Sequence, residues 1–128
     1  MIDVKSIDDI SLILAAKFGH KDVVKVLIDG GFDPNIQDAK FGVSSLHVAS
    51  YYGYLDVAKE LLDNGAESSI KNHRRATPLH YAAFDGHTDL VYLLINRGAR
   101  TNMTGTNFGL TPLQISALVG LKDTVRIL

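Results

Sequence analysis

Apolar side chains follow a helical period along this chain, and glycines interrupt the period at regular intervals. In one stretch, Leu79, Ala82 and Ala83 lie three or four residues apart, which places them on one face of a helix. Gly86 then breaks the helix, because glycine reaches backbone conformations that residues with a side chain resist. Residues 89–95 carry a second apolar face. The pattern predicts two short helices joined by a turn.

This helix–turn–helix pattern recurs about four times. The turn glycine is found at Gly19, Gly53, Gly86 and Gly120, at steps of 34, 33 and 34 residues. Three further sets keep the same steps: Leu12, Leu46, Leu79 and Leu113; Ala16, Ser50, Ala83 and Ala117; and Val24, Ala58, Val91 and Val125. One helix pair cannot bury its apolar face, whereas stacked copies can. We therefore expect an all-α fold, an elongated solenoid of stacked helix–turn–helix units.

Capping residues mark the ends of these helices. Thr77-Pro78 begins a helix, since the hydroxyl accepts from free amides and proline needs no amide partner there. Thr111-Pro112 repeats this pair, and Ser44-Ser45 keeps the capping hydroxyl without the proline. Gly98 lies where a left-handed cap ends the second helix. These signals place the helix start at the same point of three copies.

The composition of the chain restricts its possible functions more than its possible folds. Of 128 residues, 46% are hydrophobic and 21% are charged, as in ordinary soluble proteins, and cysteine is absent. The 13 basic and 14 acidic side chains give a net charge of −1, which argues against binding nucleic acid or an anionic membrane through overall charge. No apolar run approaches the roughly 20 residues that span a bilayer, and the acidic N-terminus is unlike a signal peptide. We expect a cytoplasmic or nuclear protein.

Taken together, the repeated residues resemble the ankyrin repeat family. The third copy carries the most specific match, in Thr77-Pro78-Leu79-His80, Ala82-Ala83, Gly86-His87, Leu93-Leu94 and Gly98-Ala99. The resemblance covers nearly the whole chain and implies that the connections between copies project as short β-hairpin loops. It implies a single domain, 1–128, with a capping repeat at about 4–38, repeats at 39–71 and 72–105, and a partial repeat at 106–128.

The ends and the loops depart from the family pattern. Ile10-Ser11-Leu12-Ile13 stands in the first copy where the motif should be, which suits a capping repeat. The last copy stops at Leu128, before its second helix is complete, so we expect further repeats in a longer natural protein or a frayed end. Two connections are one residue longer than the other and carry a Phe-Gly pair, Phe41-Gly42 and Phe108-Gly109. Each ring is either exposed at its loop tip or folded back onto its own loop.

The stretch from His80 to His87 invites a metal or catalytic interpretation. The two histidines are seven residues apart, about 10 Å along a helix, whereas zinc ligands all lie near 2 Å from one ion. Asp85 is replaced by Tyr52 in the second copy, so no nucleophile and base are kept together. We expect no metal, no cofactor and no enzymatic activity. Instead, His80 should bond the Thr77 hydroxyl and His87 should settle its turn.

The resemblance implies another function, which is to bind a protein or peptide partner in a concave groove lined by the first helices and the loop tips. The positions just before each turn glycine face such a groove, and four of these eight residues are aromatic. Folding does not require aromatic rings there, and such rings are favoured at interfaces. Alternatively, some rings complete the core against neighbouring loops. The candidate contacts are Phe18, Tyr51, Tyr52, Phe84 and Asp85, with Phe41 and Phe108 at loop tips.

One loop tip is basic rather than aromatic. It contains Lys71, His73, Arg74 and Arg75, and Arg75 stands where the family usually has glycine. A solvated loop is the simplest interpretation, and a patch for an acidic or phosphorylated partner is the alternative. We therefore include Arg74 and Arg75 among the candidate partner contacts. Aromatic residues beside basic ones also suggest single-stranded nucleic acid, but the near-neutral chain argues against it.

Two alternatives to an independent binding module stay open. The repeats could be the targeting or substrate-recruiting arm of a larger enzyme or effector. They could also be substrates themselves, because hairpin asparagines of this family can be hydroxylated. Asn35 and Asn102 occupy that position, whereas Ser69 replaces the asparagine in the copy between them. In each case we expect a monomer.

Overall fold

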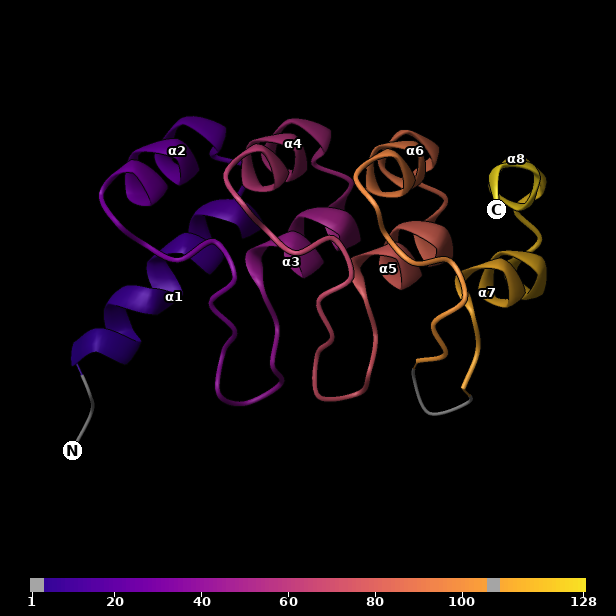
Figure 1. The fold of residues 1–128 in the computed structure, drawn as a ribbon, viewed down its shortest axis with the longest axis horizontal. Coiled ribbons are helices and arrows are strands. Elements are labelled where there is room, and N and C mark those ends of the chain that lie inside the picture. Colours follow the sequence, from indigo (N-terminus) through magenta and orange to yellow (C-terminus); the bar gives the residue numbers. More distant parts are fainter. Residues whose placement is uncertain (1–3, 106–108) are drawn as a thin grey trace.

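The computed structural model describes residues 4–105 and 109–128, and this part of the chain forms eight helices. In chain order they are α1 (Val4–Lys17), α2 (Lys21–Asp29), α3 (Ser45–Tyr52), α4 (Leu55–Asp63), α5 (Pro78–Asp85), α6 (Thr88–Asn96), α7 (Pro112–Val119) and α8 (Lys122–Ile127). Successive helices pack in pairs, one pair for each copy of the sequence pattern (Figure 1). The all-α repeat fold is confirmed.

The helices form two rows with projecting loops on one side. α1, α3, α5 and α7 pack on one another in order and form the inner row, while α2, α4, α6 and α8 form the outer row. The connections between pairs extend from the inner row, away from the outer helices (Figure 1). The inner helices and the loops therefore share one long face of the solenoid.

The hydrophobic core lies between the two rows. Leu46 and Leu79 of the inner row belong to the same buried cluster as Leu61 and Leu94 of the outer row. All four are at most 1% exposed, and burying each contributes about 1.5–3 kcal/mol. The equivalent residues of successive copies thus form one continuous core, as the repeat predicts.

The helices begin and end at the predicted capping residues. α3 follows Ser44, whose hydroxyl accepts from the His47 amide at 3.2 Å. α7 follows Thr111, whose hydroxyl accepts from the Gln114 amide at 3.2 Å. α3 ends at Gly53 with a φ of +79°, the left-handed conformation that favours glycine.

The first helix differs from the other inner helices. α1 has 14 residues, whereas α3, α5 and α7 have 8 each. Ile10 occupies the position of the capping residues Ser44 and Thr77, and its side chain has no acceptor for a free amide. The helix therefore begins earlier, at Val4. None of the helices in the described ranges is long and apolar enough to cross a membrane.

The connections between pairs are short hairpins. In loop A (38–43) the first amide donates to the last carbonyl at 2.9 Å, and loop B (72–76) closes in the same way at 3.0 Å. An isolated antiparallel bridge joins Gln37 to Ser44 at the base of loop A. The described residues form no longer strand, so these are the projecting hairpin loops expected from the sequence. Phe108, a candidate contact, lies outside the described residues.

Candidate partner-binding groove

A hollow of about 740 Å³ opens on the face shared by the inner helices and the loops. Its walls come from α1, α3, α5 and loop A, and most of its lining side chains are apolar or aromatic. The apolar ones, with the phenylalanine of loop A, are Ile10, Ile13, Leu14, Phe41, Val43 and Val48. We call this hollow the groove pocket. A concave, largely apolar surface of this kind suits the side chains of a partner.

Aromatic rings form a connected chain along one wall of the groove pocket. The Tyr81 ring lies edge-on to His47, with 5.9 Å between ring centroids, and edge-on to Tyr51 at 6.1 Å. Tyr51 is edge-on to Tyr52 at 5.0 Å, and Tyr52 stacks on Tyr54 at 5.6 Å. Each such pair contributes about 0.5–1.5 kcal/mol beyond the burial of its surface. The tyrosines are thus oriented by one another in the free protein.

Three of the predicted contact residues meet in this pocket, namely Phe41, Tyr51 and Tyr52. Phe41 and Tyr51 are each 51% exposed and Tyr52 is 43% exposed, so folding leaves much of each ring in water. The Lys40 ammonium lies 5.2 Å from the centroid of the Phe41 ring. Of the two interpretations of Phe41, the exposed one agrees with the structure.

The other aromatic candidates lie outside the groove pocket. Phe18 is 61% exposed and Phe84 is 56% exposed, at the ends of α1 and α5. Lys17 extends over the Phe18 ring, with its Nζ 5.7 Å from the centroid. Asp85 is exposed beside Phe84. A contact between these residues and a partner stays a prediction.

Several lining residues carry no capping or turn signal and were not predicted. Leu14, Val48 and Tyr81 lie in α1, α3 and α5. Each is three positions before a residue near the end of its helix, namely Lys17, Tyr51 and Phe84. Residues three apart share a face of a helix, so the spacing alone places them beside the predicted contacts. Two features of the sequence could have identified these residues: their spacing from the predicted contacts, and the fact that the residue at this position differs from copy to copy.

Loop B places basic residues next to the groove pocket. The Asn72 side-chain oxygen accepts from the amides of Arg74 and Ala76 at 2.9 and 3.0 Å. Its amide nitrogen donates to the Tyr81 hydroxyl at 2.8 Å. Arg75 has a φ of +63°, the left-handed region that favours glycine. Both predicted arginines are exposed, at the tip of a loop that is bonded to a wall of the pocket.

His47 and His80 each connect the start of a helix to the following loop. Nδ1 of His47 accepts from the Ser44 amide at 3.2 Å, and its Nε2 donates to the Ala76 carbonyl of loop B at 2.9 Å. His80 repeats this arrangement with the Thr77 amide and the next connection, at 3.0 Å for each bond. The predicted contact between His80 and the Thr77 hydroxyl is confirmed at 2.8 Å.

The surroundings of these two histidines favour the neutral ring. Burial lowers the pKa of both His47 and His80 below the ordinary value of 6.5, because the charged form loses its hydration. The bonds to backbone carbonyls oppose this effect in part. A proton on Nδ1 would also face a backbone N–H that now donates to it. These rings therefore serve as fixed hydrogen-bonding links between repeats.

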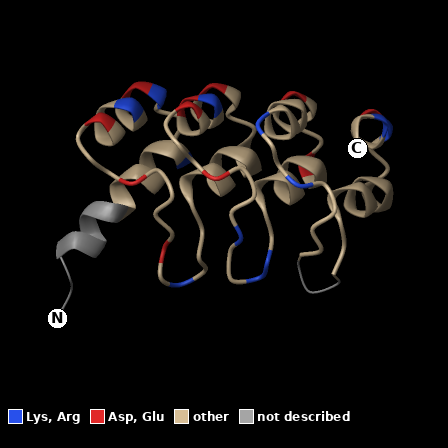
Figure 2. Cartoon of the chain, viewed as in Figure 1, with Lys and Arg blue, Asp and Glu red and all other residues tan. Residues whose placement is uncertain are grey.

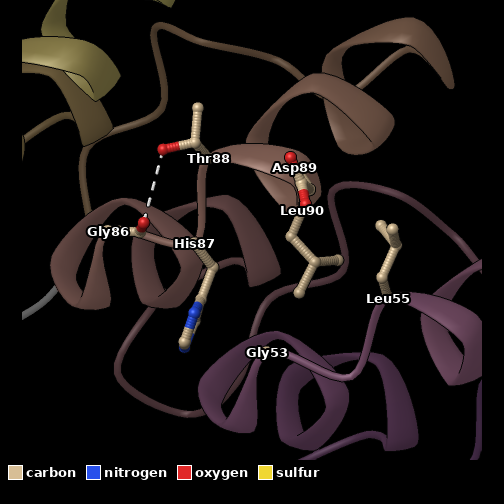
Figure 3. Close-up of a pocket in the computed structure, with 7 residues that line it drawn as sticks. All are labelled: Gly53, Leu55, Gly86, His87, Thr88, Asp89 and Leu90. Atoms are coloured by element: carbon tan, nitrogen blue, oxygen red, sulfur yellow. Dashed lines mark hydrogen bonds between the residues drawn. The ribbon is translucent and has the colours of Figure 1, made fainter.

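His87 contacts the preceding repeat rather than settling its own turn. Its ring points from the turn after α5 toward the end of α3 (Figure 3). The Nε2 lies 3.2 Å from the Tyr51 carbonyl, and a Cβ built on Gly53 would come within 2.6 Å of the ring. The expected local role of His87 is thus replaced by a contact between repeats. No cluster of three or more His, Cys, Asp or Glu side chains fit for a metal is found in the described residues.

The hairpin asparagine of the first copy also links two repeats. The Asn35 side chain donates to the Gly65 carbonyl at 3.0 Å and accepts from the Glu67 amide at 2.7 Å. Ser69 supplies the acceptor in the next copy, where its hydroxyl accepts from the Arg100 amide at 2.9 Å. Asn102, the other predicted hydroxylation position, is exposed.

Stacked helix pairs with projecting loops define a helical repeat solenoid, a class in which each unit contacts its neighbours. A model for ankyrin repeats in three copies matches residues 5–72 and 46–128. The chain therefore belongs to the ankyrin repeat family. Ankyrin repeats are generally protein–protein interaction modules and are typically non-catalytic. No curated protein gives a significant match to the chain.

Proposed function

We propose that this chain binds a partner protein through a segment that inserts side chains into the groove pocket. The observation that carries the proposal is the set of half-exposed rings at Phe41, Tyr51 and Tyr52, which line one hollow of about 740 Å³. Interfaces concentrate their binding energy in a few aromatic residues near the centre. Phe18, Phe84, Asp85 and the loop B arginines would make surrounding contacts with the same partner.

The distribution of charge supports this assignment of the face. From Ile10 onward, the described inner helices carry two charged side chains, Lys17 and Asp85. Figure 2 shows acidic and basic residues gathered on the outer helices and on the loops instead. A face depleted of charge resembles the centre of an interface, whereas the outer row has the charged surface of a helix in water.

Replacing both groove tyrosines tests the proposal. The chain is used to capture proteins from a cell extract, and the captured proteins are quantified by mass spectrometry. We expect Tyr51→Ala/Tyr52→Ala to reduce capture of the specific partner at least about thirtyfold, because two interface rings are lost. Unfolding should be easier by about 1–2 kcal/mol, because ring pairs with Tyr54 and Tyr81 disappear. The matched control is Tyr92→Ala, because Tyr92 is 54% exposed on the outer helix α6.

The comparison between these two variants decides the matter. A partner retained by Tyr92→Ala and lost by the groove variant supports the groove. A partner retained equally by both variants contradicts it.

Modification of the hairpin asparagines is less favoured as a function. The Asn35 side chain already serves a structural role, because its amide is bonded on both sides by the next repeat, and the exposed Asn102 has no contact that favours modification over solvation among the described residues. No contact within the described residues favours the recruiting arm of a larger enzyme over an independent module.

A further inference from the structure

Ion pairs in the described residues lie on the outer side of the solenoid. They join residues of the outer helices and their ends: Lys25 with Glu60 at 3.9 Å, Arg97 with Asp63 at 2.6 Å, and Arg126 with Asp123 at 3.6 Å. The basic residues of the two loops have no carboxylate within 4.0 Å among the described residues. The cations of the binding face are thus available to a ligand.

The tips of the loops carry an excess of positive charge. Residues 71–76 contain Lys71, Arg74 and Arg75 and no acidic residue, and Lys40 lies at the tip of loop A. Figure 2 shows basic residues at both loops. Loop A also contains Asp38, but its carboxylate accepts from two amides of its own loop at 2.8 and 3.1 Å. The four basic residues outnumber this one carboxylate, and an acidic ligand relieves the repulsion among them.

Backbone and side-chain bonds hold this charge next to the groove pocket. The His73 amide of loop B donates to the Phe41 carbonyl of loop A at 3.0 Å. Asn72 connects loop B to the hydroxyl of Tyr81, the lining residue that α5 supplies. With the bond from His47 to the Ala76 carbonyl, loop B is bonded to three of the residues that line the pocket, and Arg74 extends from this loop. An extended peptide advances about 3.3 Å per residue, so a short segment reaches from the pocket to the loop tips.

We propose that the partner segment is an acidic peptide, with an apolar side chain in the groove pocket and Asp or Glu carboxylates on Arg74 and Arg75. This inference rests on the function proposed above and adds the chemistry of the partner. The guanidinium group matches a carboxylate through two parallel hydrogen bonds. Carboxylate peptides are favoured over a nucleic acid strand because the basic residues are confined to the loop tips and the chain as a whole has a net charge of −1.

Selection from a random peptide library displayed on phage tests the inference without a known partner. With the wild-type chain as bait, enriched sequences should share an apolar residue flanked within a few positions by Asp or Glu. The best peptide is then labelled with a fluorophore, and its affinity is measured by fluorescence anisotropy. Raising sodium chloride from about 50 to about 300 mM should weaken binding severalfold, because salt screens exposed charge pairs.

Matched charge removals show where the acidic residues bind. Arg74→Gln/Arg75→Gln should weaken the selected peptide about five- to twentyfold and flatten its salt dependence. Lys21→Gln/Lys59→Gln removes the same charge from exposed positions of α2 and α4 and should change affinity less than twofold. Replacing the acidic residues of the peptide by Gln should reproduce the effect of the arginine variant, and the two changes together should add little more.

Each other outcome overturns the inference in a distinguishable way. Some enriched peptides could bind the Tyr51→Ala/Tyr52→Ala variant weakly and yet lack acidic residues, or bind the arginine variant as tightly as the wild type. Such peptides contradict the acidic partner alone. Peptides that bind the tyrosine variant as tightly as the wild type contradict the proposed function as well, and so does a failure to enrich any peptide. Tighter binding of a phosphoserine version of the peptide, or of oligo(dT), through the same residues would replace the carboxylate ligand with phosphate chemistry or with nucleic acid.

Discussion

Loop A and loop B follow one backbone plan, but loop B is held more firmly. The Asp38 carboxylate accepts from two loop A amides at 2.8 and 3.1 Å, and the Asn72 side chain accepts from two loop B amides at 2.9 and 3.0 Å. Only the asparagine also has hydrogens to donate, and it uses them to reach the Tyr81 hydroxyl. A single change from carboxylate to amide therefore attaches loop B to the neighbouring helix.

A histidine adds to this difference. Nε2 of His47 donates to the carbonyl of Ala76, the last residue of loop B. The corresponding position ahead of loop A is Ile13, whose side chain has no polar atom. The loop that presents Phe41 thus lacks two attachments that the loop with the arginines possesses.

Acidification should destabilise the fold, because a proton on Nδ1 of His47 or His80 displaces the backbone amide that donates to that nitrogen. Because burial lowers the folded-state pKa of His47 and His80, the unfolded chain takes up protons first as the pH falls below 6.5. Stability is then lost on going down in pH toward the folded-state pKa, by up to about 1.4 kcal/mol per pH unit for each ring. Urea unfolding at about pH 7, 6 and 5 measures this slope.

Glutamine provides the control for this effect, because the last copy has Gln114 in the histidine position. The variant His47→Gln/His80→Gln should be less stable near pH 7 and should lose much of the pH dependence between about pH 5 and 7. A variant whose slope matches that of the wild type would assign the titration to other groups.

Asn72 offers the next largest effect. Asn72→Ala should destabilise the fold by about 2–3 kcal/mol, because two loop amides lose their acceptor and Asn72 is 8% exposed. Asn72→Asp copies loop A, since it keeps the acceptor and removes the donor to Tyr81, and should cost about 1 kcal/mol. Denaturant midpoints give both values. Equal losses for the two variants would show that the Tyr81 bond, rather than the loop bonds, supplies the stability.

Gly42 tests the tip of loop A. Its φ is +69°, and a Cβ there would lie 2.5 Å from the His73 ring of loop B, so Gly42→Ala should destabilise by about 2 kcal/mol. Gly109 has a φ of +64°, and no atom of the described residues lies within 4 Å of an added Cβ. Gly109→Ala should therefore cost about 1 kcal/mol, from the backbone alone. The difference between the two thermal unfolding curves reports the contact between the loops.

The sequence predicted best the features that are local and repeated. The capping contact between Thr77 and His80 spans three residues and recurs, so its bond was expected and is present. The bond from His47 to the Ala76 carbonyl was not, because it depends on a backbone atom that stacking brings from the next repeat. The hydrogen bond between Asn72 and Tyr81 could not be predicted either, because this pair of residues occurs in one copy and is not repeated in the others.

Arg75 permits the smallest test, and it separates stability from binding. At a φ of +63° a residue with a side chain costs about 1–2 kcal/mol of backbone strain. Glycine removes this strain, but it loses more conformational entropy on folding, which offsets part of the gain. Arg75→Gly should therefore raise stability by about 0.5–1 kcal/mol, measured by urea unfolding, while weakening the acidic peptide. Arg75→Lys keeps both the charge and the strain, so its stability should stay near that of the wild type. If the glycine variant gains stability without losing affinity, the strained arginine is not placed there for a ligand.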